Sequence, residues 1–302
     1  MTNVVHSLGS AVTWLNSPKG FLALMGALVA VLVLLGLFTS TMTIAWRELK
    51  RYFRSPASYL VLAMFLLYQG VVFFMLISLL NGPNADPSPP MRWFFGGVIW
   101  FYPVFVFVVA MLTCSLLTSE QRERTIETLM TAPVRESEVV LGKFLGTMGF
   151  FVFMWLWTLV YIIILSNVGA GQKINPGPVL SGYVGTLLIC ALGVSFGLLC
   201  SALTRDLLLA LMATVIGLKL VFIVKLMMVF GVLKTPGDKP GRFMGLISSD
   251  WINRVFEHTM IIDFMDDFSQ GIVDSRNVIY LLSATALFLF AAVRVLQLRK
   301  WR

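Results

Sequence analysis

Few residues of this sequence combine a reactive side chain with a spacing that could support catalysis or metal binding. The three cysteines, Cys114, Cys190 and Cys200, lie in apolar runs without a CxxC spacing, so neither a disulfide framework nor a zinc site is predicted. The two histidines, His6 and His258, belong to no HExxH pattern, and no GxxxxGK(S/T) phosphate loop occurs. We therefore predict no catalytic, cofactor or metal site, and any ATP hydrolysis that powers the protein must be performed by another chain.

The segment 119–143 is the densely charged part of the chain that separates two apolar runs. Ile126, Leu129 and Met130 follow an i, i+3, i+4 spacing, which predicts a short helix with one apolar stripe. Such a helix on the membrane surface favours contact with a soluble partner. Its charged residues are Glu120, Arg122, Glu123, Arg124, Glu127, Arg135, Glu136, Glu138 and Lys143.

Two lysines, Lys219 and Lys225, lie inside an apolar run that begins at Leu207. At 1.5 Å per residue, Lys219 would lie roughly 18 Å deep, whereas Lys225 is deep enough to reach the opposite surface. Exposing a lysine to lipid near the midplane costs on the order of 2.5–3.5 kcal/mol. Lys219 is therefore a candidate for a translocation path, a partner helix or a bound anion. The alternative is a structural hydrogen bond to carbonyl groups of a neighbouring span.

The composition indicates what positions these residues, because 58% of the chain is hydrophobic and only 13% is charged. A soluble protein carries about 25% charged residues, so the chain is predicted to be an all-α integral membrane protein. Each apolar run is long enough to cross a hydrocarbon core of about 30 Å. The predicted spans are 20–38, 57–80, 93–117, 144–166, 183–203, 207–232 and 278–296, the third of them kinked at Pro103.

The segment 42–54 has the pattern of an amphipathic helix on the membrane surface. Its aromatic side, with Ala45, Leu49, Tyr52 and Phe53, is expected among the acyl chains, and its basic side at anionic headgroups. The basic side consists of Arg47, Lys50, Arg51 and Arg54. Ser55-Pro56 is expected to end this helix. The alternative reading is a basic anchor without a further role.

Two other patterns predict packing and surface helices. Glycines at GxxxG spacing, Gly142 with Gly146 and Gly193 with Gly197, favour close helix contacts, within the chain or in a dimer. The segment 169–178 is expected to be a loop. In the segment 247–273, apolar residues at helical spacing predict two short external amphipathic helices that rest on the membrane or dip into it.

The distribution of basic residues predicts the orientation. With the 119–143 segment inside, 13 of the 23 basic residues lie in the cytoplasm, eight lie outside and two lie in a span. The positive-inside rule then places the N-terminus outside and the C-terminus in the cytoplasm. The net charge of +8 is thus an orientation signal, and nucleic acid is not an expected partner.

The charged segment resembles the cytoplasmic loop of the ATP-binding-cassette (ABC) type-2, export-type, permeases. The matching residues are Glu120, Thr125, Glu127, Leu129, Pro133, Leu141, Gly142 and Lys143, and Arg124 replaces the glycine of the family pattern. The segments from 42 onward and at the C-terminus look most like the gliding-motility (Gld-type) branch. The resemblance covers residues 42–302, so residues 1–41, with the first span, are interpreted as an N-terminal extension.

The resemblance implies a permease subunit with six family spans, an elbow helix at 42–54 and a coupling helix in the 119–143 loop. ATP and magnesium would be bound by a separate ATPase subunit, and two copies of it would work with two permeases, identical or sibling. The residues implied to contact the ATPase are Glu120, Arg124, Thr125, Glu127, Leu129 and Pro133. A companion membrane protein with an external domain, and a location in the bacterial inner membrane, are also implied.

Two other functions are compatible with a multi-span protein. A mechanotransmitter would use ATP hydrolysis inside the cell to act on an external protein without moving a solute. A secondary transporter or channel is disfavoured, because no predicted span contains Asp, Glu or His and no inverted repeat is visible.

Overall fold

The computed structural model describes residues 40–80, 94–95, 101–122, 136–168, 176–229 and 261–300. The predicted first span, the loop after residue 80 and the external segment 247–260 lie outside these residues. The described part is helical throughout, apart from short turns. Its helices are α3 (Ser40–Arg54), α4 (Pro56–Leu80), α6 (Phe101–Thr113), α7 (Ser115–Arg122), α9 (Glu136–Val168), α10 (Pro176–Leu203), α11 (Leu207–Val229), α13 (Ile261–Ser269) and α14 (Ser275–Lys300).

Five helical segments of the described chain are long and apolar enough to cross a membrane. They are Pro56–Ser78, Tyr102–Arg122, Glu136–Leu165, Pro176–Leu203 and Ser275–Leu298, and α11 adds a shorter apolar stretch at Leu207–Leu220. The protein is therefore a multi-pass helical membrane protein, as its composition predicts.

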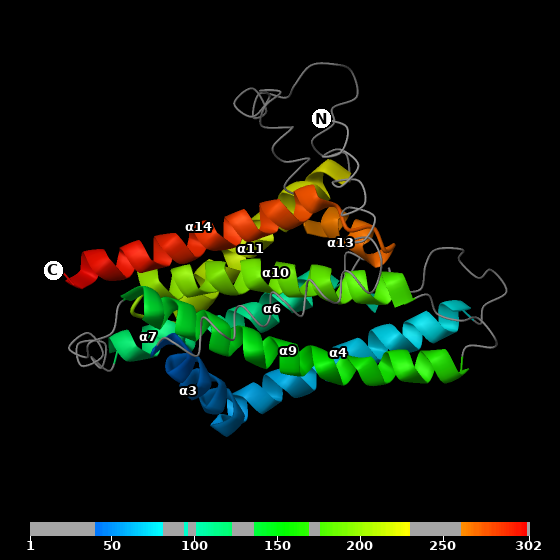
Figure 1. Cartoon of the computed structure of the whole chain (residues 1–302), viewed down its shortest axis with the longest axis horizontal. Coiled ribbons are helices and arrows are strands. Elements are labelled where there is room, and N and C mark those ends of the chain that lie inside the picture. Colours follow the sequence, from blue (N-terminus) through cyan, green and yellow to red (C-terminus); the bar gives the residue numbers. More distant parts are fainter. Residues whose placement is uncertain are drawn as a thin grey trace, which may run out of the picture.

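α10 lies at the centre of the bundle, in contact with α6, α9, α11, α13 and α14 (Figure 1). Most of its length is buried, whereas α4 and α14 expose most of theirs. The end of the bundle on the left in Figure 1 holds α3, α7, the first turn of α9, the α10–α11 turn and the last turn of α14. The predicted topology puts these same segments on the cytoplasmic side.

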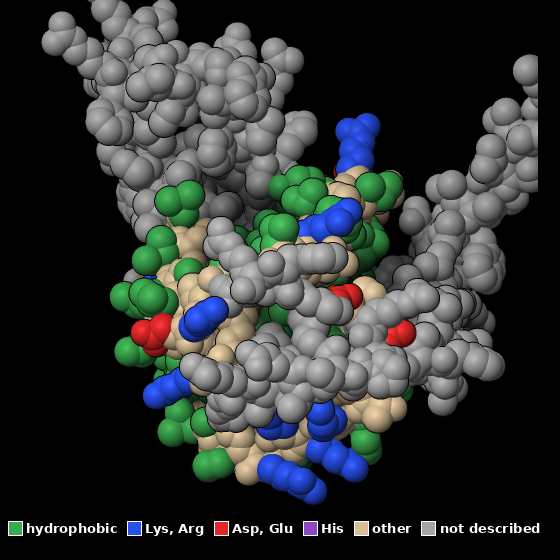
Figure 2. All heavy atoms as spheres, turned by 90° about the vertical axis from the view of Figure 1, so that its left-hand side faces the viewer, with side chains coloured by type: hydrophobic (Ala, Val, Ile, Leu, Met, Phe, Trp, Pro, Cys, Tyr) green, Lys and Arg blue, Asp and Glu red, His purple; other side chains and the backbone are tan. Residues whose placement is uncertain are grey.

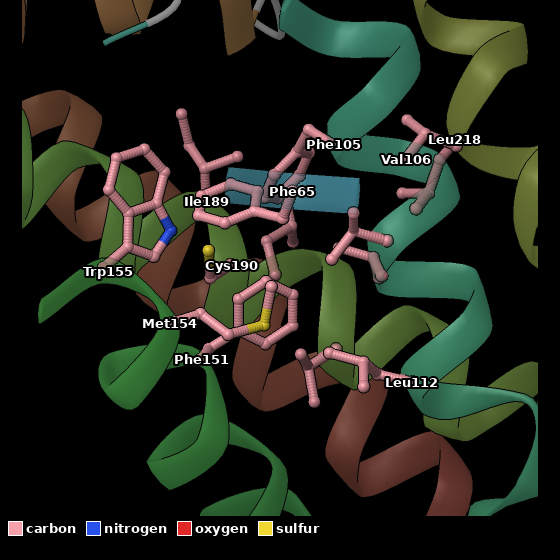
Figure 3. Close-up of a cluster of buried hydrophobic side chains, with 14 of the residues drawn as sticks. Phe65, Phe105, Val106, Leu112, Phe151, Met154, Trp155, Ile189, Cys190 and Leu218 are labelled. Atoms are coloured by element: carbon pink, nitrogen blue, oxygen red, sulfur yellow. The ribbon is translucent and has the colours of Figure 1, made fainter. Parts of the chain in front are cut away.

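The core is formed by aromatic and aliphatic side chains where α4, α6, α9 and α10 meet (Figure 3). Phe65, Phe151, Trp155 and Ile189 converge there, and the Cys190 thiol lies among them, fully buried. All three cysteines are buried and unbridged, in agreement with a packing role.

Both glycine pairs serve contacts within the chain. A Cβ added at Gly142 or Gly146 would come within 3.0 Å of α3, at the Ile44 side chain and the Ala45 carbonyl. On α10, a Cβ at Gly197 would overlap the Thr113 side chain of α6. Because these glycines have no side chain, α3 packs closely on α9, and α6 packs closely on α10.

One prediction about helix bounds is wrong and another is not tested. Residues 96–100 lie outside the described part, so the predicted kink at Pro103, in the first described turn of α6, stays a prediction. The break in this span lies at Cys114, between α6 and α7. The segment 176–178, predicted as loop, forms the first turn of α10, since proline is well tolerated there.

The turns between helices are capped as the sequence suggests. α3 ends at Arg54 and α4 starts at Pro56, so Ser55-Pro56 does separate them. Asp274 accepts the N–H of Arg276 (2.9 Å) at the start of α14, and Asp206 accepts the N–H of Leu208 (3.2 Å) at the start of α11.

The apolar face of α13 packs on the protein's own helices. Phe264, Met265 and Phe268 are buried, and Ser181 of α10 donates a hydrogen bond to the Phe268 carbonyl (2.5 Å). These side chains are therefore covered by protein, although Ile272 remains exposed, and the position of α13 on the membrane or dipping into it stays a prediction.

Candidate functional site

A buried cluster of charges lies at the end of the bundle that holds α3 and α7. The Lys143 ammonium, with no exposed side-chain surface, donates to Glu48 Oε1 of α3 (2.7 Å), to Glu120 Oε1 of α7 (2.7 Å) and to the Leu116 carbonyl (2.6 Å). An ammonium group has three N–H donors, so these three acceptors satisfy it completely. One side chain of α9 thus binds two neighbouring helices at once.

Two arginines complete this cluster on its outer side. Arg51 Nε lies 3.1 Å from Glu48 Oε2, and Arg47 Nη2 lies 3.8 Å from Glu120 Oε1. Side-chain exposure rises from 0% at Lys143 through 3% at Glu48 and 17% at Glu120 to 37% at Arg51 and 57% at Arg47. The two carboxylates therefore lie between a buried lysine and two arginines nearer to solvent. We call these five residues the Lys143 cluster.

The local sequence explains why a lysine can be buried here. Gly142 and Gly146 bring the α3 backbone against α9, and this contact leaves the Lys143 side chain enclosed between α3 and α7. A buried charge is tolerated only when it is paired and hydrogen-bonded, and Glu48 and Glu120 supply that pairing.

Tyr52 adds a second polar link between α3, α6 and α9. Its hydroxyl donates to the Leu112 carbonyl (2.7 Å) and lies 3.1 Å from Thr147 Oγ1, while its ring stacks on Phe150. Burial raises the pKa of Tyr52 to about 12, so the phenol stays protonated and able to donate at physiological pH.

A serine of α10 holds the break between α6 and α7. The Ser201 hydroxyl accepts the N–H groups of Leu117 (2.9 Å) and Thr118 (3.1 Å) and donates to the Cys114 carbonyl (3.2 Å). In an unbroken helix the Thr118 N–H would bond to the Cys114 carbonyl, so the hydroxyl is inserted between these two groups. Gln121 also donates to the Ala202 carbonyl (3.1 Å).

The predicted ATPase contact lies mostly outside the described residues. Glu120 is described, and its carboxylate is engaged with Lys143 inside the chain. Its predicted contact with an ATPase stays a prediction. The same holds for the residues beyond the described part, Arg124, Thr125, Glu127, Leu129 and Pro133. The structure does show that α7 leads into this segment and that α9 follows it.

The predicted surface helix 42–54 corresponds to α3. Its basic residues do share one side, and Lys and Arg side chains gather over α3 at the lower edge of Figure 2. Arg47, Lys50 and Arg54 are exposed, and the Lys50 ammonium lies 5.3 Å from the centre of the Trp46 ring.

The opposite side of α3 differs from the prediction. Ala45 and Tyr52 are buried against α9, because the glycines of α9 leave room for them, so their predicted exposure to acyl chains is wrong. Trp46 and Met42 are the exposed apolar residues of α3, next to its basic side. The helix therefore has a protein-facing side, an apolar edge and a basic edge.

Lys219 lies on α11, next to the exposed Leu220, and its side chain is half-buried. Within the part of the chain that the structure describes, it makes no hydrogen bond or ion pair. The alternative of a structural hydrogen bond to a neighbouring span is thus not found among these residues.

Sequence reasoning missed the roles of Glu48, Lys143 and Ser201. Glu48 carried a signal, because it is the only acid among the four basic residues of the 42–54 segment. Lys143 was noticed only as part of a family motif. Ser201 stands in an ordinary apolar run and carries no signal for a helix break.

The fold and the site together define a multi-pass helical membrane protein. At one end of the bundle, the Lys143 cluster joins α3, α7 and α9, and α7 leads into residues 123–135, which lie outside the described part. The chain matches the family model of the ABC-2 family transporter protein over residues 85–295. It belongs to the ABC-2 family of transporter membrane proteins. No curated protein matches it.

Proposed function

We propose that the protein is the permease subunit of an ABC transporter, driven by ATP hydrolysis in a separate cytoplasmic ATPase subunit. Family membership supports a transporter membrane component. The observation that carries the coupling is the Lys143 cluster, which joins α7, at the start of the charged segment, to α3 and α9. A push on this segment would reach the surface helix α3 and the membrane-spanning helix α9 directly.

The ATPase would bind the segment between α7 and α9. Arg124, Thr125, Glu127, Leu129 and Pro133 are the proposed contacts, since the family resemblance assigns them there. Glu120 would contribute from the edge of the cluster. ATP and magnesium would be bound by the ATPase alone, in two copies that serve two permeases.

α3 would act as the elbow helix at the cytoplasmic surface. Its exposed Trp46 beside Lys50 and Arg54 is the combination that prefers the boundary between acyl chains and headgroups. Anionic headgroups would pair with the basic edge, as expected for the inner face of a bacterial membrane. This orientation puts the C-terminus in the cytoplasm and the N-terminus outside.

Further assignments follow the gliding-motility-type branch that the sequence resembles. They are a second permease, identical or sibling, and a companion membrane protein with an external domain. Residues 1–41 would form an N-terminal extension with its own span. Lys219 would face the second permease or the path between the two copies, because a charge near the midplane needs a partner.

Mechanotransmission without solute transport is the second candidate function. It is favoured by the exposed side of α4, which carries large apolar residues rather than a polar stripe that could line an aqueous path. These are Leu60, Met64, Leu67, Val71, Phe74 and Met75. The two functions differ in whether two assembled copies enclose a polar path across the membrane.

The coupling proposal is tested by affinity purification of the tagged protein from its native membrane in mild detergent. We expect an ABC ATPase to be recovered, and the double variant Arg124→Glu/Glu127→Lys to lose it. Reversal of Glu120 is avoided, because it would also disturb the Lys143 cluster.

The control is Arg276→Glu, an exposed charge reversal at the start of α14, at the other end of the bundle. It should recover the ATPase normally. If no ATPase is found in an otherwise intact oligomer, or if the double variant retains it fully, the proposed function is wrong.

A further inference from the structure

The Lys143 cluster connects three helices through one buried ammonium group. Lys143 on α9 bonds to α3 through Glu48, and to the α6–α7 region through both Glu120 and the Leu116 carbonyl. Two of its three bonds thus end on the short segment that leads to the proposed ATPase contact. Apolar packing alone could have joined these helices, since a buried ion pair often adds little net stability over apolar residues.

A hydrogen-bonded ion pair, unlike an apolar contact, fixes the relative position of the two groups. The carboxylate of Glu120 has to stay within hydrogen-bond distance of one ammonium group, whereas apolar side chains can slide past one another with small changes in energy. The short α7 can therefore pivot at Cys114 only as far as this bond allows.

A second contact holds α7 from the other side. Ser201 binds the N–H groups of Leu117 and Thr118, and Gln121 donates to the Ala202 carbonyl, so α10 fixes the N-terminal turn and one side of α7. The Lys143 cluster fixes Glu120, one turn further along. Together the two contacts determine the direction in which α7 leaves the membrane.

We propose that Lys143 is a positioning residue that locks α7 to the α3–α9 pair, so that the elbow, the base of the coupling segment and α9 move as one body. The lock itself is a property of this chain. Only its use in transmitting force rests on the proposed function.

The bonds of Lys143 differ in how easily they can be released. Glu48 is almost fully buried and holds Lys143 to α3, whereas Glu120 is partly exposed and also lies near Arg47. Removing the charge of Glu120 therefore leaves the Glu48–Lys143 pair and the bond to the Leu116 carbonyl intact and removes only the ionic bond between Lys143 and α7. This gives a variant that tests the lock without leaving a buried charge unpaired.

The lock is tested by spin-label distance measurements on the purified full-length protein, with cysteines introduced at Arg54 of α3 and Arg122 of α7. Both positions are exposed, and the native cysteines are buried, which limits background labelling. We expect a single narrow distance distribution in the otherwise native chain. Lys143→Met should broaden it most, because it removes both bonds from Lys143 to α7, and Glu120→Gln should broaden it less, because the bond to the Leu116 carbonyl remains.

Lys50→Met is the matched control, since it removes an exposed lysine of α3 that lies outside the cluster. It should leave the distribution narrow. Equal, narrow distributions in Glu120→Gln and the control would overturn the proposal, and so would a broad distribution in the native chain. If Lys143→Met does not fold, Glu120→Gln decides alone.

A second readout separates positioning from simple stabilisation. In the complex with its ATPase, the distance between the two labels should be the same with ADP and after trapping with ATP and vanadate, because the labelled helices move together. In Glu120→Gln the distance should change on trapping. Failure to recover any ATPase would refute the proposed function, whereas the measurements on the isolated protein would still decide whether the lock exists.

Discussion

The family resemblance implies that Glu120 contacts an ATPase, whereas in the structure its carboxylate lies against Lys143 within the same chain. Both functions require a carboxylate at this position, so residue type and spacing do not separate them. The bond between Glu120 and Lys143 depends on how closely α3 packs on α9, and Gly142 and Gly146 allow this close packing. The glycines could be found in the sequence, but the helix that packs on them could not.

Lys219, unlike Glu120, can be singled out from the sequence alone, because placing a lysine inside the membrane costs free energy. A lysine near the midplane is expensive in any fold, so its position alone indicates a partner. Among the described residues Lys219 has no hydrogen bond or ion pair, so its role in a translocation path stays a prediction.

We predict that Lys219→Met keeps the amount of assembled complex unchanged and lowers its activity at least about tenfold, the effect of losing roughly 1.4 kcal/mol of interaction. The activity is measured by complementation of a deletion mutant, because the substrate is not identified. Arg294→Met, which removes an exposed cation from α14, is the control and should complement fully. Full complementation by Lys219→Met would exclude a role in the path.

At the scale of helices, long apolar runs were easy to predict and their interruptions were not. The spans follow from hydropathy, and caps such as Asp274 mark their ends. No proline or glycine marks the break at Cys114 in the sequence, because the Ser201 hydroxyl of α10 causes the break. Such a break depends on a tertiary contact and so lies beyond local sequence patterns.

We predict that Ser201→Ala destabilises the protein by about 1–3 kcal/mol, because the N–H groups of Leu117 and Thr118 lose their partner in a buried site. Thermal unfolding in detergent would measure the loss as a lower Tm. The control is Ser195→Ala on the same helix, since Ser195 is equally buried and, among the described residues, bonds to Leu192 of its own helix. An equal shift in both variants would show that the Ser201 hydroxyl does not hold the break.

At the scale of the whole molecule, the order of the predicted spans indicates which segments share one side of the membrane. α3, α7, the α10–α11 turn and the end of α14 do lie at one end of the bundle (Figure 1). This agreement follows from simple alternation, because each span reverses the side of the next loop. The packing of α13 on α10 could not be predicted in this way, since an apolar face can be covered by lipid or by protein.

We predict that cysteines introduced at Arg54, Arg122 and Arg205 react with a membrane-impermeant maleimide in inverted vesicles but not in intact cells. All three positions are exposed at the end of the bundle that we assign to the cytoplasm. A cysteine at Arg276, at the other end, should show the reverse pattern. Labelling of the first three from outside the cell would reverse the proposed orientation.

The length of α9 has a mechanical consequence. Its 33 residues form one helix without a break, about 50 Å long, which exceeds the hydrocarbon core of about 30 Å. Lys143 lies in the second turn, close to the end that the proposed orientation places in the cytoplasm. A tilt of about ten degrees about that end would displace the far end by about 9 Å, so in this orientation a small rotation at the cytoplasmic end becomes a large displacement at the outer surface.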